Sequence, residues 1–261
     1  MKNRTTYLTL GLITALSLGF ILPQNKSSNS QTREVNSGFA LVELFTSEGC
    51  SSCPPADELI SRVQAKIGDQ PIYILAFHVD YWNRLGWRDP YSKAEYSERQ
   101  NKYAKWLNLS SVFTPQLIVN GKTEFIGSEE LKLRNAIQSN LNKVNPVHLN
   151  LYSSVDPTRE INFKYEIAGL SSINYQIIVA LVEKNSTSHI KQGENEGKTL
   201  NHVQIVRELK IIDLISSFSG QSSIPESQNF NSGKMEIIGF IQNSKTGEIL
   251  AASKSCFSNL N

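Results

Sequence analysis

Residues 41–58 read LVELFTSEGCSSCPPADE and contain the strongest structural and chemical signals in the chain. An apolar segment leads into Cys50, and two serines separate Cys50 from Cys53. Pro54 and Pro55 follow, and proline is tolerated in the first turn of a helix because the N–H groups there have no intrahelical partner. The stretch predicts a buried strand, a CxxC pair in a tight connection and a helix that begins after the second cysteine.

Strands and helices are expected to alternate on both sides of this motif. Residues 113–127 predict two strands joined by an Asn120-Gly121 turn, because Asn-Gly accepts the positive φ angles of a tight hairpin. The other expected elements are buried strands at 38–47 and 72–79, helices at 54–67 and 92–107, and a last helix after Ser128.

The pattern changes after Pro146. Six segments look like strands, several of them alternate between apolar and polar residues, and polar loops rather than helices separate them. Strands without intervening helices do not form parallel units, so residues 146–261 predict a separate β-sandwich domain.

The order of elements before Pro146 resembles the thioredoxin fold. The CxxC pair lies between the first strand and its helix, and Thr114-Pro115 opens the strand before the hairpin, where thioredoxin-like proteins carry a cis-proline that faces the cysteines. The resemblance implies an α/β thioredoxin-like fold over residues 38–145, followed by a small all-β, sandwich-like domain over residues 146–261.

A narrower resemblance extends over nearly the whole chain after its N-terminal segment. The blocks VELFTSEGCSSCPPADE, AFHVDYWNRLGWRDPYS, FTPQLIVNG and GENEGKTLNHVQIVREL resemble those of an exported bacterial family, domain of unknown function 1223. That family is catalogued as thioredoxin-like and has no assigned function. The resemblance implies a fold directly and a reaction only by analogy with thioredoxins.

The N-terminus has the layout of an export signal. Lys2 and Arg4 precede an uncharged, largely apolar run over residues 7–22, and a polar linker continues to residue 37. No small-x-small cleavage site follows, so an uncleaved anchor formed by residues 7–22 is the alternative. Both readings place the protein outside the cytoplasm, in the periplasm or the extracellular space, where a redox-active disulfide is common.

Composition excludes several other classes of function. The chain has 261 residues, a net charge of +2 and three cysteines. So small a charge gives no electrostatic reason to expect a nucleic acid partner, and a zinc site would require a second pair of cysteines. Contact with a membrane is expected only through the N-terminal anchor.

The two cysteines of the CxxC pair receive separate roles. A thiolate attacks a disulfide, so one cysteine needs a lowered pKa and some exposure. Cys50 is expected to be the exposed nucleophile, and Cys53 the resolving thiol. Glu48 and Asp57 bring negative charge that opposes ionisation, and the direction of electron transfer stays open. A purely structural disulfide is the alternative, although so short a loop constrains the unfolded chain little.

His78 ends the second strand, where it is expected beside the CxxC pair. There it would take the thiol proton or bind a soft metal together with both sulfurs, and a purely structural histidine is the alternative. Asp80 either orients His78 or caps its loop. The aromatic residues Tyr81, Trp82, Trp87 and Tyr91 either line a groove for an extended polypeptide or pack a long loop.

The expected function is an extracytoplasmic thiol–disulfide oxidoreductase that uses no cofactor and acts on exported protein thiols or on a redox relay partner. Its expected site residues are Cys50, Cys53, Thr114, Pro115 and His78. One alternative is a non-enzymatic carrier that holds copper with Cys50, Cys53 and His78, since thiolate and imidazole suit Cu(I). Another is a redox-inactive protein that binds a partner through its β domain. Near the C-terminus, a third cysteine at position 256 is expected to be a small buried thiol, with pairing to another chain as the alternative.

Overall fold

The computed structural model describes residue 1 and residues 38–156, 160–171, 174–215, 217–225 and 230–257. The predicted export signal or anchor therefore lies outside the described residues. Within the described ranges, no helix is both long enough and apolar enough to cross a membrane.

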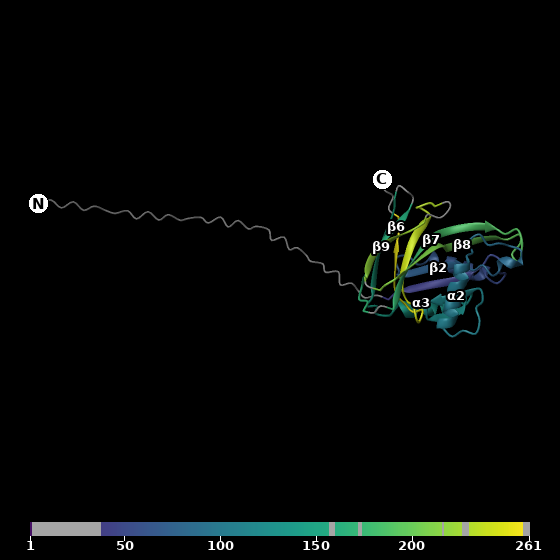
Figure 1. Ribbon diagram of the computed structural model, residues 1–261, viewed down its shortest axis with the longest axis horizontal. Helices are drawn as coiled ribbons and strands as arrows, with labels where there is room; N and C mark the ends of the chain where they lie inside the picture. Colours follow the sequence, from purple (N-terminus) through teal and green to yellow (C-terminus); the bar gives the residue numbers. More distant parts are fainter. Residues whose placement is uncertain (2–37, 157–159, 172–173, 216, 226–229, 258–261) are drawn as a thin grey trace. The chain divides into compact units, whose positions relative to one another are not determined.

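Three α-helices, one short 3-10 helix and eleven strands make up the described part of the chain (Figure 1). The helices are α1 (Pro54–Gln64), η1 (Asn83–Leu85), α2 (Ala94–Trp106) and α3 (Glu130–Leu141). The strands are β1 (Ala40–Thr46), β2 (Ile72–His78), β3 (Gln116–Val119), β4 (Thr123–Ile126), β5 (His148–Val155), β6 (Ile161–Ala168), β7 (Tyr175–His189), β8 (Thr199–Asp213), β9 (Ser219–Ile224), β10 (Met235–Asn243) and β11 (Ile249–Ser255).

Eight of these strands form one mixed sheet in the order β11-β10-β7-β8-β2-β1-β3-β4. The pairs β1–β2 and β2–β8 are parallel, whereas the other neighbours are antiparallel. The strands β5, β6 and β9 form a second, three-stranded antiparallel sheet. The predicted Asn120-Gly121 turn joins β3 to β4, with φ angles of 48° and 68° at its two residues.

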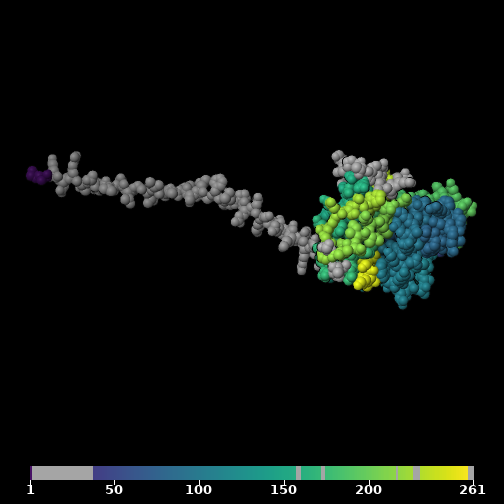
Figure 2. Space-filling view, viewed as in Figure 1, coloured from purple at the N-terminus to yellow at the C-terminus, as the bar shows by residue number. Residues whose placement is uncertain are grey.

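The predicted division into an α/β thioredoxin-like fold and a separate all-β domain is wrong. Strands β7, β8, β10 and β11 belong to the second half of the chain, yet they extend the same sheet that contains β1 to β4. Described residues on both sides of the predicted boundary at 145/146 also belong to one compact unit. In Figure 2 the blue first half and the green second half accordingly share one continuous surface.

The junction between the halves is the pairing of β8 with β2. Ala76 of β2 is in register with Ile205 of β8, and both residues are buried. Without β8, the backbone N–H and C=O groups on this side of β2 would form an open sheet edge. The alternating pattern of the later segments correctly indicates strands, but a local pattern carries no information about which strand becomes the neighbour.

Both faces of β1 are covered, which explains its continuous apolar sequence. Successive side chains of a strand point to opposite faces. Val42 and Leu44 pack with apolar residues of α1 and α3, whereas Leu41 and Phe45 pack with Tyr96 and Tyr103 of α2 and with residues of β7 and β10. The three-stranded sheet covers the opposite face of β7 and β10, where Leu149, Leu151 and Phe163 meet Val179, Leu181 and Ile237.

A buried ion pair lies between β1 and α2. The Arg99 guanidinium of α2 donates to both carboxylate oxygens of Glu43 on β1, at 2.6 and 3.0 Å, and to Gln242 of β10 at 3.1 Å. Tyr103 completes the group through hydrogen bonds with Glu43 and Gln242. Burial alone would lower the pKa of Arg99, but the adjacent Glu43 charge raises it above its usual value. The bonds of Arg99 and Tyr103 to Gln242 thus link this ion pair to the second half of the chain.

Candidate functional site

Cys50 and Cys53 are joined by a disulfide, with 5.4 Å between their Cα atoms. Cys50 lies in the connection between β1 and α1, and Cys53 is the N-cap residue of α1. Because the first helical residue is Pro54, Cys50 lies outside the first turn of the helix. The positive end of the helix dipole is therefore nearer to Cys53 than to Cys50.

The expectation that Cys50 is exposed is wrong. Both cysteines have 0% exposed surface, whereas Ser51 and Ser52 between them are exposed. The disulfide thus lies just beneath a short exposed segment. Cys256, by contrast, is an exposed free thiol rather than the buried one that its sequence suggested.

The peptide bond between Thr114 and Pro115 is cis, as predicted. It lies beside the disulfide, because the Thr114 carbonyl oxygen is 3.8 Å from Cys50 Sγ and 3.5 Å from Ser52 Oγ. The Thr114 hydroxyl accepts a hydrogen bond of 2.8 Å from Trp82 Nε1. The structure therefore brings together four of the five predicted site residues, namely Cys50, Cys53, Thr114 and Pro115.

His78, the fifth predicted residue, is fully buried and bonded to a carboxylate. Its Nδ1 atom is 2.7 Å from Asp89 Oδ2. Asp89 also accepts backbone N–H bonds from Glu48 and Tyr91, so it acts as the acceptor and His78 as the donor. Burial alone would raise the pKa of Asp89, but His78 and these N–H groups lower it below its usual value. His78 Nε2 has no hydrogen-bond partner among the described residues.

Asp80 does not orient His78. Its backbone N–H and its carboxylate are both bonded to the Ser97 hydroxyl of α2. Asp80 therefore fixes the start of its own loop, as one of the two sequence interpretations proposed.

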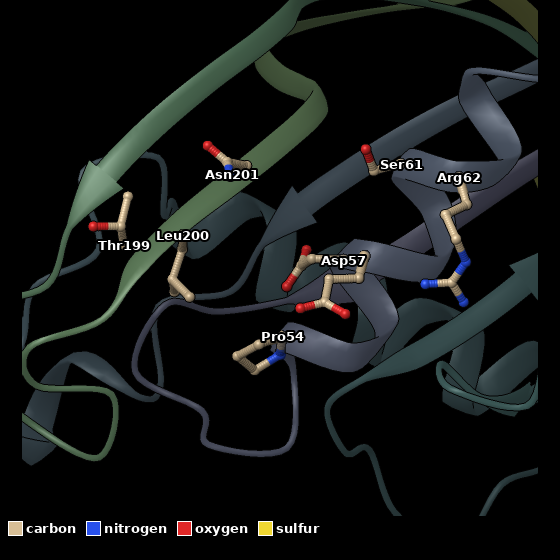
Figure 3. Close-up of a pocket in the computed structure, with 8 residues that line it drawn as sticks. Pro54, Asp57, Ser61, Arg62, Thr199, Leu200 and Asn201 are labelled. Atoms are coloured by element: carbon tan, nitrogen blue, oxygen red, sulfur yellow. The ribbon is translucent and has the colours of Figure 1, made fainter.

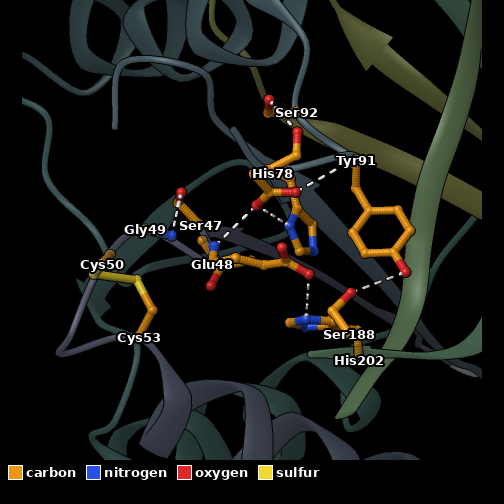
Figure 4. Close-up of polar contacts among 12 residues, drawn as sticks. Ser47, Glu48, Gly49, Cys50, Cys53, His78, Tyr91, Ser92, Ser188 and His202 are labelled. Atoms are coloured by element: carbon orange, nitrogen blue, oxygen red, sulfur yellow. Dashed lines mark hydrogen bonds and ion pairs between the residues drawn. A yellow bond between two sulfur atoms is a disulfide. The ribbon is translucent and has the colours of Figure 1, made fainter. Parts of the chain in front are cut away.

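His202 of β8 forms the second charged contact of the site. Its Nε2 atom is 3.2 Å from Glu48 Oε1 (Figure 4). Its Nδ1 atom is 3.9 Å from Asp57 Oδ1. The second distance is too long for a hydrogen bond, so Asp57 acts on His202 through its charge. Burial lowers the pKa of His202, but the carboxylates of Asp57 and Glu48 outweigh it and raise that pKa to about 10.

These five residues, Glu48, Asp57, His78, Asp89 and His202, form what we call the buried charged cluster. The imidazole rings of its two histidines meet edge to face, with 4.9 Å between their centroids. The cluster adjoins the disulfide on both sides along the chain, because Glu48 lies two residues before Cys50 and Asp57 lies four residues after Cys53. The surroundings of the disulfide are therefore charged although they are buried.

The loop aromatics pack around this cluster. Trp87 Nε1 donates to Glu48 Oε2 at 2.7 Å, and the Tyr91 ring contacts the rings of both histidines. Tyr81 is bonded to Gln100 of α2 at 3.3 Å. With Trp82 bonded to Thr114, these contacts fit the interpretation that the aromatics pack their loop.

A pocket of about 340 Å³ opens beside the helix that carries Cys53 (Figure 3). Residues of α1 and of the start of β8 line it, among them Pro54, Asp57, Ser61, Thr199 and Asn201. Asp57 belongs both to this pocket and to the buried charged cluster. Its carboxylate, which also accepts a 3.0 Å hydrogen bond from Thr46, is therefore the point where the cluster approaches solvent.

The predicted copper ligands do not form a ready metal site. Within the described ranges, no three or more His, Cys, Asp and Glu side chains are arranged to hold a metal ion. In the disulfide form, moreover, Cys50 and Cys53 are bonded to each other. Copper binding by these two cysteines and His78 stays a prediction.

Sequence reasoning missed His202, Asp89 and Asn195. Asn195, on the connection between β7 and β8, is 0% exposed and donates to the carbonyls of Glu48 and Cys50 at 2.8 and 2.9 Å. Asn195 and His202 both lie in the segment GENEGKTLNHVQIVREL, whose sequence indicates membership of the family but no chemical role for either residue. This family block is the one sequence feature that points to the two residues. Their chemical roles depend on contacts with a distant part of the chain, which the sequence does not reveal.

The chain belongs to the family described as protein of unknown function (DUF1223), which matches residues 41–242. The match covers the cysteines, the charged cluster and most of the large sheet. No curated protein matches the chain.

Two solved structures resemble most of the chain. The X-ray crystal structure of protein AGR_C_4864 from Agrobacterium tumefaciens is 25% identical, with a TM-score of 0.65, covering 85% of this chain and 95% of that one. HBP35 of Porphyromonas gingivalis is 14% identical, with a TM-score of 0.60, covering 85% of this chain and 76% of that one. The second likeness concerns the fold alone.

Proposed function

For this member of the DUF1223 family, we propose the function of an extracytoplasmic thiol–disulfide oxidoreductase. Cys50 and Cys53 exchange two electrons with cysteine pairs of exported proteins or of a relay partner. The observation that carries the proposal is the Cys50–Cys53 disulfide at the start of α1, with the Thr114 carbonyl oxygen 3.8 Å from Cys50 Sγ. Exchange chemistry needs two cysteines close in sequence and nearby groups that can affect the ionisation of their thiols. The Cys50–Cys53 pair and the adjoining charged cluster meet both requirements.

The exchange proceeds through a mixed disulfide. In the reduced protein the Cys50 thiolate attacks one sulfur of a substrate disulfide, and the other substrate sulfur leaves as a thiolate that takes up a proton. Cys53 then loses its proton and attacks Cys50 Sγ, which releases the second substrate sulfur as a thiolate. Two electrons have passed from the protein to the substrate, and the protein ends as the disulfide. The same steps in reverse oxidise a substrate dithiol.

The buried charged cluster supports the proton transfers of this reaction. Asp57 lies one helical turn beyond Cys53, and its backbone N–H donates to the Cys53 carbonyl at 3.1 Å. Its carboxylate lines the 340 Å³ pocket and faces His202. With a pKa of about 10, His202 carries a positive charge at neutral pH, and this charge faces the Asp57 and Glu48 carboxylates. Asp57 is therefore the group we assign to accept the proton that Cys53 releases.

Trapping of the mixed disulfide tests the proposal. Because Cys256 is exposed and would form adducts of its own, each variant carries Cys256→Ser. A synthetic peptide with one internal disulfide serves as the probe. Reduced Cys53→Ser protein should accumulate an adduct through Cys50, since the resolving thiol is absent, whereas Cys50→Ser protein should accumulate far less.

Mass spectrometry under non-reducing conditions measures the adduct and identifies the cysteine that carries it. Equal trapping by the two variants would contradict the assigned roles of the cysteines. If neither variant forms an adduct, the proposed exchange is wrong.

A further inference from the structure

The connection between β7 and β8 lies against the loop that carries the cysteines. We call residues 190–198 the strap. The Glu194 carboxylate accepts a 3.0 Å hydrogen bond from the Ser51 N–H, and the Asn195 amide donates to the carbonyls of Glu48 and Cys50 at 2.8 and 2.9 Å. The strap therefore holds the backbone on both sides of Cys50.

The fold of the strap itself presents Asn195 to this loop. Backbone hydrogen bonds close the strap, from Ile190 N–H to Lys198 O and from Gly197 N–H to Ile190 O, both at 2.9 Å. Gly197 has a φ angle of 78°, which favours glycine. The Asn195 side chain is further fixed by a 2.9 Å bond that its Oδ1 atom accepts from Lys198 Nζ. Asn195 is thus preorganised before it meets the cysteine loop.

Burial distinguishes Asn195 from its neighbours in sequence. Its exposed fraction is 0%, whereas Glu194 and Glu196 on either side are exposed. The two cysteines of the neighbouring loop are also 0% exposed. Attack on a disulfide depends on access to its sulfur atoms, so a thiol reaches this disulfide only after the cysteine loop or its cover has moved.

We propose that the strap is a displaceable cover that controls access to the disulfide, with Asn195 as the positioning residue that fixes the cysteine loop. The inference rests on the proposed function, for which it supplies the step that admits the substrate. Release of the strap frees two carbonyl acceptors and one N–H donor around Cys50. An incoming polypeptide backbone satisfies both kinds of group, as the strap does.

Reduction by dithiothreitol measures this access directly in the full chain. A dithiothreitol thiolate attacks Cys50 Sγ, the Cys50–Cys53 bond breaks, and Cys53 leaves as a thiolate that takes up a proton. The second dithiothreitol sulfur then attacks the mixed disulfide and releases Cys50, which takes up a proton as well. Dithiothreitol ends as its cyclic disulfide and the protein has gained two electrons.

Three variants separate the strap contacts from a general change of charge. Asn195→Asp keeps the size of the side chain and removes both N–H donors, and Glu194→Gln weakens the bond to Ser51. Glu196→Gln makes the same charge change as Glu194→Gln, at an exposed position whose side chain has no hydrogen bond or ion pair with the described residues. Loss of two hydrogen bonds should raise the rate constant for reduction about tenfold in Asn195→Asp. Glu194→Gln should give a smaller increase, and Glu196→Gln should react like the parent.

Hydrogen exchange of the Ser51 amide provides a second measurement. It should quicken in Glu194→Gln, an exposed change that leaves the core intact, and should be unchanged in Glu196→Gln. Equal reduction rates in all four proteins, with unchanged Ser51 exchange, would overturn the inference. Faster reduction without any trapped peptide would support the strap and reject the proposed function, whereas trapping with equal reduction rates would do the reverse.

Discussion

His202, on β8, places its Nε2 atom 3.2 Å from the Oε1 atom of Glu48, two residues before Cys50. The two residues are 154 positions apart in the chain, and both are buried. The contact makes the second half of the chain part of the surroundings of the disulfide. Asn195 adds a second contact of the same kind, to the Glu48 and Cys50 carbonyls.

The first prediction concerns the pH dependence of stability. The pKa of His202 rises from an ordinary 6.5 to about 10 in the folded protein. A raised pKa means that the stabilisation is complete below the unfolded value and is lost as the pH rises through the folded one. The free energy of unfolding contributed by His202 should therefore be full below about pH 6.5 and gone above about pH 10. Urea unfolding of the parent and of His202→Gln at pH 6, 8 and 10 measures it.

The gap in stability between parent and variant should shrink steadily over this range. His189→Gln is the control, because His189 is an exposed histidine of β7 that is bonded to Thr199. The difference in the free energy of unfolding between the parent and His189→Gln should not vary with pH in the same way. A gap for His202→Gln that stays constant from pH 6 to pH 10 would refute the charge assigned to His202.

The second prediction concerns the buried pair of Arg99 and Glu43. Replacement of Arg99 by Met leaves the Glu43 carboxylate buried without a counterion, and such losses cost about 3–5 kcal/mol. Equilibrium unfolding in urea should show a decrease of that size. Arg134→Met is the control, because it breaks an exposed pair with Glu130 on α3 and should leave stability nearly unchanged. Similar losses in both variants would contradict the structural role of the buried pair.

The third prediction concerns Gly127, which packs between the disulfide helix and the cis-proline. A Cβ atom at this position would lie 2.7 Å from Pro115 Cβ and 2.9 Å from Ala56 Cβ. Neither neighbour has a flexible side chain that could move aside, so Gly127→Ala should destabilise the protein by about 1–3 kcal/mol. Gly233→Ala, on an exposed loop, should cost much less because its Cβ would meet only Asn231 Oδ1, at 3.2 Å. Thermal and urea unfolding compare the two, and a Gly127→Ala protein as stable as the parent would show that this packing is looser than described.

The fourth prediction distinguishes a redox-active disulfide from a purely structural one. Cys50 and Cys53 are three positions apart, so their disulfide closes a very short loop. Loop entropy then accounts for about 2 kcal/mol of stability. Unfolding of oxidised and reduced Cys256→Ser protein should differ by about that amount, with the reduced form still folded. A reduced protein that no longer folds would indicate that the disulfide is purely structural.

Some features of the site could be predicted from local sequence alone. The apolar run before Cys50 forms β1, and the prolines after Cys53 begin α1 at Pro54. Asn120-Gly121 forms its tight turn because those two residues accept positive φ angles. Each of these features depends on residues a few positions apart, and the pattern of side chains contains that information.

What the sequence could not determine is which distant segments meet. The strands after Pro146 are visible as alternating patterns, but the pairing of Ala76 with Ile205, which joins the two halves into one sheet, is a choice among several apolar strands of similar pattern. That pairing brings β8, and with it His202, to the cluster around Glu48. Hydrophobic burial is non-directional, so local pattern determined where strands and helices form, and only tertiary packing decided which charged residues surround the disulfide.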